Sequence, residues 1–187
     1  PEAVKLDLQL HATDLGVRQP RILPGSFLYP LKKFWRSVRL VLTFDPIARA
    51  ELFLQQSNEK TLEAAILLQK DQSQKTIGVV LGILDKVRGD FEVLKSKSQS
   101  LMALKKDDPK KVDALIDKII ANGLARQTLF SAVQNNVYGA DFVKVERIRQ
   151  QVLSDGVSTL LTLSDNDAQI LVEKVEAALE KQSGSQF

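Results

Sequence analysis

The stretch from Ile22 to Leu52, which reads ILPGSFLYPLKKFWRSVRLVLTFDPIARAEL, decides the fold. It contains a Pro-Gly-Ser turn at residues 24–26, a basic amphipathic segment, a second turn that ends in Asp45-Pro46, and the start of another helical segment. So short a connection favours two neighbouring helices that run in opposite directions. The sequence therefore predicts a helical hairpin near the beginning of the chain.

Helical periodicity continues along most of the chain, with apolar side chains every three or four residues. Asp45-Pro46 and Asp108-Pro109 are strong start signals, because aspartate accepts hydrogen bonds from the first amides and proline fits the first turn. A last helix is expected to begin at Ser164, which would cap it. Asp165 and Asp167 would lie in its first turn, where negative charge meets the positive end of the helix dipole. The helices before it are predicted at about residues 27–42, 46–69, 77–101, 109–134 and 142–153.

These segments predict an all-α fold, a bundle of about six helices of which two are long. Val4, Leu6, Leu8 and Leu10 alternate with polar residues, which is the pattern of an extended segment. Without a second strand to pair with, this segment is expected to lie over the helices or to form a poorly ordered tail. The predicted organisation is an extended arm and loop at residues 1–25, a helical bundle at 26–182 and a tail at 183–187.

The beginning of the third predicted helix, residues 77–84, is apolar on nearly all sides and is expected to be the most buried part of the bundle. Gly78, Gly82 and Gly89 each cost about 1 kcal/mol relative to alanine inside a helix. Close approach of another helix would compensate for that cost, so we expect a neighbour to pack against these glycines.

The composition is that of an ordinary globular protein. The chain has 187 residues, of which 44% are hydrophobic, and 26 basic residues nearly balance 23 acidic ones. This balance gives no reason to expect a nucleic-acid partner. The longest apolar run, residues 76–84, is far shorter than the roughly 20 residues that span a bilayer.

The absence of cysteine excludes disulfides, thiolate metal sites and cysteine nucleophiles. It also favours, weakly, an extracytoplasmic protein. The sequence begins at Pro1, as expected after removal of a signal peptide or anchor, or after trimming for other reasons. The expected location is therefore the cell envelope or the outside of the cell, with the cytoplasm as the alternative.

Several short motifs near the beginning of the chain carry a family resemblance. They are Asp14-Leu15-Gly16-Val17, Leu23-Pro24-Gly25-Ser26, Tyr29-Pro30-Leu31-Lys32, Leu42-Thr43-Phe44-Asp45-Pro46 and Arg49-Ala50-Glu51-Leu52. This combination resembles a bacterial family of unknown function that is found in predicted envelope or secreted proteins. The resemblance implies a helical extracytoplasmic module behind an amino-terminal signal or anchor, and it supplies no catalytic residues.

The best candidate binding face is basic. Lys32, Lys33, Arg36 and Arg39 lie close together on the first predicted helix, and no acid occurs between residues 27 and 42. Such a face can bind an anionic membrane or polymer. Alternatively, it is an outer face whose charges are neutralised by acids of neighbouring helices.

The aromatic residues of the same region allow two interpretations. Tyr29, Phe34, Trp35 and Phe44 could form an aromatic platform that binds sugars, lipids or bases. However, Trp35 shares an arc with leucine and valine side chains, and this spacing favours packing in the core.

Sites for chemistry are hard to find in this sequence. Residues 165–167 resemble the start of a calcium loop, but Ile170 stands where such a loop needs glycine. His11 is the only histidine and lies in the predicted arm, and there is no phosphate-binding glycine loop. We therefore expect no enzyme, no metal site and no cofactor.

The leading expectation is an interaction or structural module of the bacterial cell envelope whose partner is another envelope protein. The first alternative is binding of an anionic surface or polymer through the basic face, with peripheral membrane contact favoured over nucleic acid. The second alternative is an apolar-ligand carrier with a cavity inside the bundle. The sequence does not indicate an oligomeric state.

Overall fold

A computed structural model describes residues 13, 15–18, 20–165 and 167–184, with side chains described up to residue 179. The alternating segment at residues 4–10, His11 and the last part of the predicted tail, 185–187, lie outside the described residues. No strand occurs in the described part of the chain.

The described chain forms six α-helices, which confirms the predicted all-α fold. Their bounds are α2 (Tyr29–Leu42), α3 (Pro46–Lys70), α4 (Gln74–Ala103), α5 (Pro109–Gln134), α6 (Gly139–Leu163) and α7 (Ala168–Gly184), with a short 3₁₀ helix, η1 (Leu104–Lys106), between α4 and α5. Four of them, α3 to α6, have 25 to 30 residues, where the sequence predicted two long helices.

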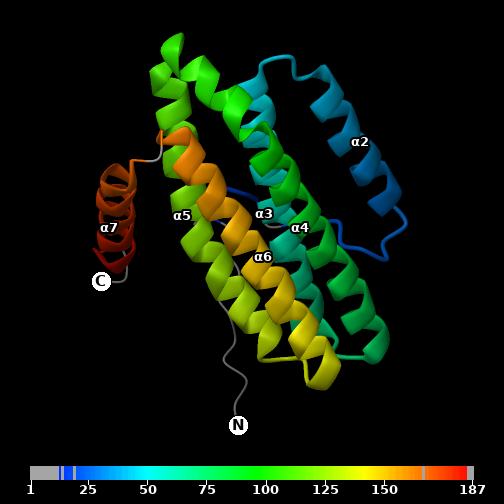
Figure 1. Ribbon diagram of the computed structural model, residues 1–187. Helices are drawn as coiled ribbons and strands as arrows, with labels where there is room; N and C mark the ends of the chain where they lie inside the picture. Colours follow the sequence, from blue (N-terminus) through cyan, green and yellow to red (C-terminus); the bar gives the residue numbers. More distant parts are fainter. Residues whose placement is uncertain (1–12, 14, 19, 166, 185–187) are drawn as a thin grey trace.

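The four long helices form a bundle, and the two shorter ones are attached to its sides (Figure 1). In this bundle α3 packs against α4 and α5, and α6 packs against the same two helices. The connection through η1 therefore joins helices on one diagonal of the bundle. Figure 1 shows α2 on one side of the bundle, where it contacts α3, and α7 beside α5 on the opposite side.

The Asp-Pro signals mark helix starts as predicted, whereas the start of the last helix lies later than expected. The Asp45 side chain accepts a hydrogen bond from the Ile47 amide, and the Asp108 side chain accepts one from Lys111. Ser164, by contrast, is the residue that follows the carboxyl end of α6. Helix α7 begins directly after Asp167, whose carboxylate accepts hydrogen bonds from the amides of residues 169 and 170. Asp165 has a φ of 60°, a left-handed conformation that reverses the chain before α7.

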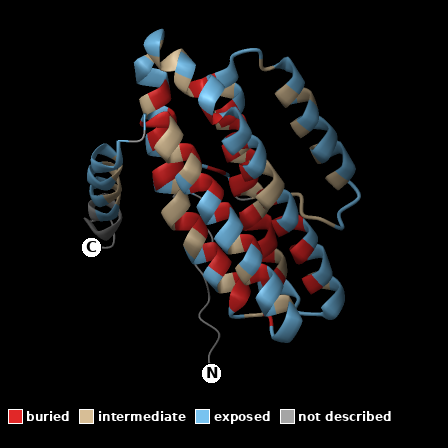
Figure 2. Ribbon diagram, in the orientation of Figure 1, coloured by how far each residue is buried: buried red, intermediate tan, exposed pale blue. Residues whose placement is uncertain are grey.

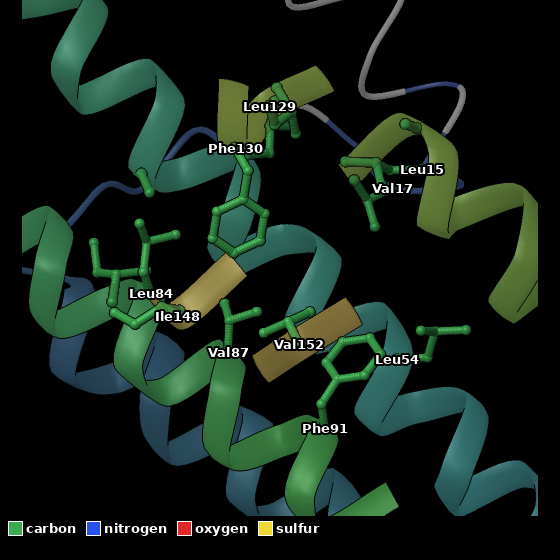
Figure 3. Packing of buried hydrophobic residues seen from close by; sticks show 14 of the residues in the cluster. Leu15, Val17, Leu54, Leu84, Val87, Phe91, Leu129, Phe130, Ile148 and Val152 are labelled. Atoms are coloured by element: carbon green, nitrogen blue, oxygen red, sulfur yellow. The ribbon is translucent and has the colours of Figure 1, made fainter. Parts of the chain in front are cut away.

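The core lies along the inner faces of α3, α4, α5 and α6 (Figure 2). Figure 3 shows Phe130, Val87, Ile148 and Val152 gathered in this interior. The expectation that residues 77–84 are the most buried part of the bundle is wrong, because Gly78, Val79 and Gly82 are exposed within that segment.

The glycines of α4 do not mark a close helix contact, which corrects a second expectation. A Cβ atom added at Gly78, Gly82 or Gly89 would have no neighbouring atom within 4 Å outside its own helix backbone. Gly156 of α6 is different, since a Cβ atom there would lie 3.6 Å from the ring of Phe91. Among the helical glycines, the one whose Cβ position meets a side chain of another helix is therefore on α6.

The most enclosed helix is α3, and its buried residues include polar side chains. These are Gln56, Ser57, Asn58, Thr61 and Glu63. Polar groups that lose water must find partners inside the protein. Two of them, Glu63 and Asn58, have partners on other helices.

Candidate functional site

The candidate site is helix α2 and the surface of α3 on which it lies. Glu63 is fully buried although it is a carboxylate. Its Oε1 atom lies 2.5 Å from the Lys32 ammonium and 2.8 Å from the Arg36 guanidinium. Arg36 also binds Glu59, at 2.7 Å. Two cations of α2 and two acids of α3 thus form one ion-pair cluster between the helices.

Neutral groups complete the contacts of this cluster. The Tyr29 hydroxyl donates a hydrogen bond to Glu63 Oε2 at 3.0 Å, and Lys32 also donates to the Ile22 carbonyl at 3.1 Å. Burial, followed by the negative charge of Glu63, raises the pKa of the Tyr29 phenol to about 12. The side chain of Gln56 donates to the Arg36 carbonyl at 3.1 Å. Helix α2 is therefore attached to the bundle mainly by polar contacts.

The apolar side of α2 consequently faces away from the bundle. No residue of α2 is buried. Five apolar side chains, which we call the α2 apolar face, are each more than half exposed: Leu31, Phe34, Trp35, Val41 and Leu42. Phe27 and Phe44, just outside the two ends of the helix, are 95% and 84% exposed. Figure 2 shows this helix mainly in the colour of exposed residues.

This orientation corrects the prediction that Trp35 packs in the core, since Trp35 is 58% exposed. The periodicity correctly placed Phe34 and Trp35 on an apolar stripe. It could not indicate that the stripe faces outwards.

The four candidate cations separate into two pairs. Lys32 and Arg36 are neutralised by the acids of α3, as the alternative interpretation of the basic face expects. Lys33 and Arg39 are exposed, and neither forms an ion pair with a described residue. Lys33 lies over the Tyr29 ring, 5.1 Å from its centre. Only these two cations are free to meet another molecule at the edges of the α2 apolar face.

Sequence reasoning missed Glu59 and Glu63, because acids in a helix are usually assigned to its outer face. One signal was present. Helix α2 carries four cations without an acid, so its charges need partners elsewhere, and Glu59 and Glu63 are one turn apart at the middle of the neighbouring helix.

A family model described as Domain of unknown function (DUF5667) matches residues 21–136. The chain belongs to this family. No curated protein and no solved structure matches the chain. The resemblance to a family of unknown function is thereby confirmed.

The DUF5667 match covers α2 to α5 and includes both sides of the ion-pair cluster. Helix α6, which completes the four-helix bundle, lies beyond it. The matched segment therefore contains the attachment of α2 but not the whole core on which the bundle depends.

Neither a metal-ion site nor a membrane-spanning helix is found among the described residues. Among them, no group of three or more acidic or histidine side chains is placed to hold a metal ion. None of the described helices combines the length and the hydropathy that crossing a membrane would require.

Proposed function

We propose that this chain is a non-enzymatic module of the bacterial cell envelope that attaches to an anionic membrane surface through the α2 apolar face. The observation that carries the proposal is the outward direction of that face. Monomeric proteins rarely expose a large contiguous apolar patch unless it meets another surface. Here the patch includes a tryptophan, a phenylalanine and two leucines on one amphipathic helix.

The charges around the patch favour a lipid surface over a protein groove. Helices that lie in a membrane interface combine aromatic and leucine side chains with flanking cations. Lys33 and Arg39 are exposed beside the α2 apolar face, and the helix has no acidic residue. Helix α2 runs along one side of the bundle, so its outer face is placed where it can meet the headgroup region of a bilayer (Figure 1).

The expected attachment is reversible. Burying each of the five half-exposed side chains contributes about 1 kcal/mol, or about 5 kcal/mol for the whole face. This is close to the binding free energy of a single myristoyl chain, which gives marginal attachment. Each of the two free cations adds about 1 kcal/mol near an anionic surface. Binding should therefore depend on anionic lipid and weaken as salt increases.

Trp35 provides the direct test, because it is the only tryptophan of the chain. Its fluorescence is measured with vesicles of phosphatidylcholine, with and without phosphatidylglycerol. The proposal predicts a blue shift and co-sedimentation with the anionic vesicles. The double variant Phe34→Ser/Leu42→Ser keeps the reporter, loses about 2 kcal/mol of apolar contact and should bind about 30-fold more weakly.

The matched control is Phe142→Ser/Val143→Ser on α6, since both side chains are exposed but lie outside α2. This control should bind vesicles like the parent chain. The absence of a Trp35 shift with every vesicle would refute the membrane proposal. The proposal would also be refuted if the parent chain formed a dimer and Phe34→Ser/Leu42→Ser did not, because the α2 apolar face would then bind a second copy of the chain. Recovery of the full-length protein in the cytoplasmic fraction of cells would refute the envelope location.

A further inference from the structure

Arg126 of α5 is a buried cation that has no carboxylate partner among the described residues. Its side chain is 3% exposed, and its guanidinium lies 4.4 Å from the centre of the Phe91 ring. It donates one hydrogen bond, at 2.6 Å, to the side-chain oxygen of Asn58. The Nε atom is buried and has no hydrogen-bond partner among the described residues. Desolvation lowers the pKa of Arg126 to about 9, so the group is still charged at neutral pH.

The arginine is held firmly in this position. Asn58 also donates from its side-chain nitrogen to the Leu15 carbonyl at 3.0 Å, which fixes the orientation of the amide. The amide oxygen is therefore directed at Arg126. The Phe91 ring provides a cation–π contact on one side. These contacts position the guanidinium but leave its positive charge unpaired.

Arg126 lines a cavity of about 230 Å³ that lies between α4, α5, α6 and α7 and is open to solvent on one side. The rest of the lining is almost entirely apolar and includes Phe91, Val152 and Val175. Figure 3 shows Phe91 and Val152 close together in the interior. Gly123 of α5 and Gly156 of α6 also belong to the lining, and the absence of side chains there leaves part of the space open.

The combination of an apolar cavity and an unpaired buried cation points to an apolar anion. A buried charge is expensive unless an opposite charge and hydrogen bonds compensate for it. A carboxylate fits the planar donor groups of arginine, and an aliphatic chain fits the remaining lining. We propose that this cavity binds a small aliphatic monocarboxylate, with its carboxylate on Arg126 and its chain between α5 and α6.

The volume limits the length of the chain. A liquid water molecule occupies about 30 Å³, so the cavity has room for about eight non-hydrogen atoms. Hexanoate has this size and is the probe of choice. Hexan-1-ol is the matched neutral probe, because it has the same chain without the charge. The site shares no residue with α2, so this inference goes beyond the proposed membrane attachment and can fail without it.

The test is isothermal titration calorimetry of the full chain with hexanoate and hexan-1-ol at neutral pH. Hexanoate should bind at least tenfold more tightly, because hydrogen bonds to a charged group are stronger than neutral ones. Arg126→Met keeps an unbranched side chain with an apolar stem but removes the charge. This variant should bind hexanoate and hexan-1-ol about equally. Equal binding of the two probes by the parent chain, or no binding of either, would overturn the proposal.

Gly123→Leu is the second variant, and it keeps Arg126 in place. A Cβ atom at Gly123 has no neighbour within 4 Å, so a leucine can enter the open space without a backbone clash. Leucine is also a better helix former than glycine. This variant should fold and lose hexanoate binding at least tenfold. Unchanged binding by Gly123→Leu would show that the anion does not occupy this cavity, and a retained preference in Arg126→Met would show that it does not contact Arg126.

Discussion

Replacing Glu63 with glutamine tests whether the ion-pair cluster holds α2 on the bundle. Removing one partner of a buried ion pair costs about 3–5 kcal/mol, because the remaining charge is left without compensation. Two features reduce this cost here. Arg36 keeps its contact with Glu59, and the side chains of Lys32 and Arg36 are still 18% and 11% exposed. We therefore expect Glu63→Gln to lower the free energy of unfolding by about 2 kcal/mol.

Urea unfolding followed by circular dichroism measures this loss. With a slope of about 2 kcal/mol per molar urea, the midpoint should fall by about 1 M. Hydrogen exchange should become faster in Glu63→Gln than in the parent chain, and this increase should be larger in α2 than in α5, because the cluster joins α2 to the bundle. Arg39→Gln is the control, since Arg39 is exposed and has no ion pair with a described residue, and it should stay within about 0.5 kcal/mol of the parent. A loss below this limit in Glu63→Gln would refute the assigned role of the cluster.

Three further predictions follow from single features of the structure. The exposed Phe34 and Trp35 can each be changed to serine with a stability loss below about 0.5 kcal/mol by thermal unfolding, whereas core aromatics cost about 3–5 kcal/mol when truncated. In Tyr138→Phe, Tyr29 is the only tyrosine, and its ultraviolet titration should centre near pH 12. Because the pKa of the folded state is raised above 10, the contribution of Tyr29 to stability is full below pH 10 and is lost as the pH rises to 12. Ionisation of the Tyr29 phenol near pH 10 in the folded chain would contradict its contact with Glu63. Gly156→Ala should raise the free energy of unfolding by about 0.5–1 kcal/mol, since its Cβ would meet Phe91 at an ordinary contact distance, and a loss of stability would show that the helices are closer than described.

The sequence predicted those parts of the fold that local signals control. Asp45-Pro46 and Asp108-Pro109 each combine a cap with a residue suited to the first turn, so both helix starts were found. Ser164 misled the prediction, because a serine after a long helix can close that helix as readily as it starts the next. Its hydroxyl donates to the Leu161 carbonyl, a contact that depends on where α6 ends.

The candidate site was predicted only in part, because its geometry depends on partners distant in sequence. The pattern of α2 separates a charged side from an apolar side, and the structure keeps that separation. Whether Lys32 or Trp35 faces the bundle is a property of the neighbouring surface. In the same way, the apolar pattern of α5 gave no sign that Arg126 lies among its buried residues, since its partner Asn58 is on another helix.

The surface of α3 explains why α2 turns its charged side inwards. Suppose that α2 rotated by half a turn, so that Trp35 and Phe34 covered Glu63. Apolar contacts would gain about 1 kcal/mol for each half-buried side chain. Glu63 would then be enclosed without Lys32, Arg36 or the Tyr29 hydroxyl, and an uncompensated buried carboxylate costs several kcal/mol. The cost of one buried acid thus offsets the hydrophobic gain of the rotated helix, and the apolar face is left for a surface outside the chain.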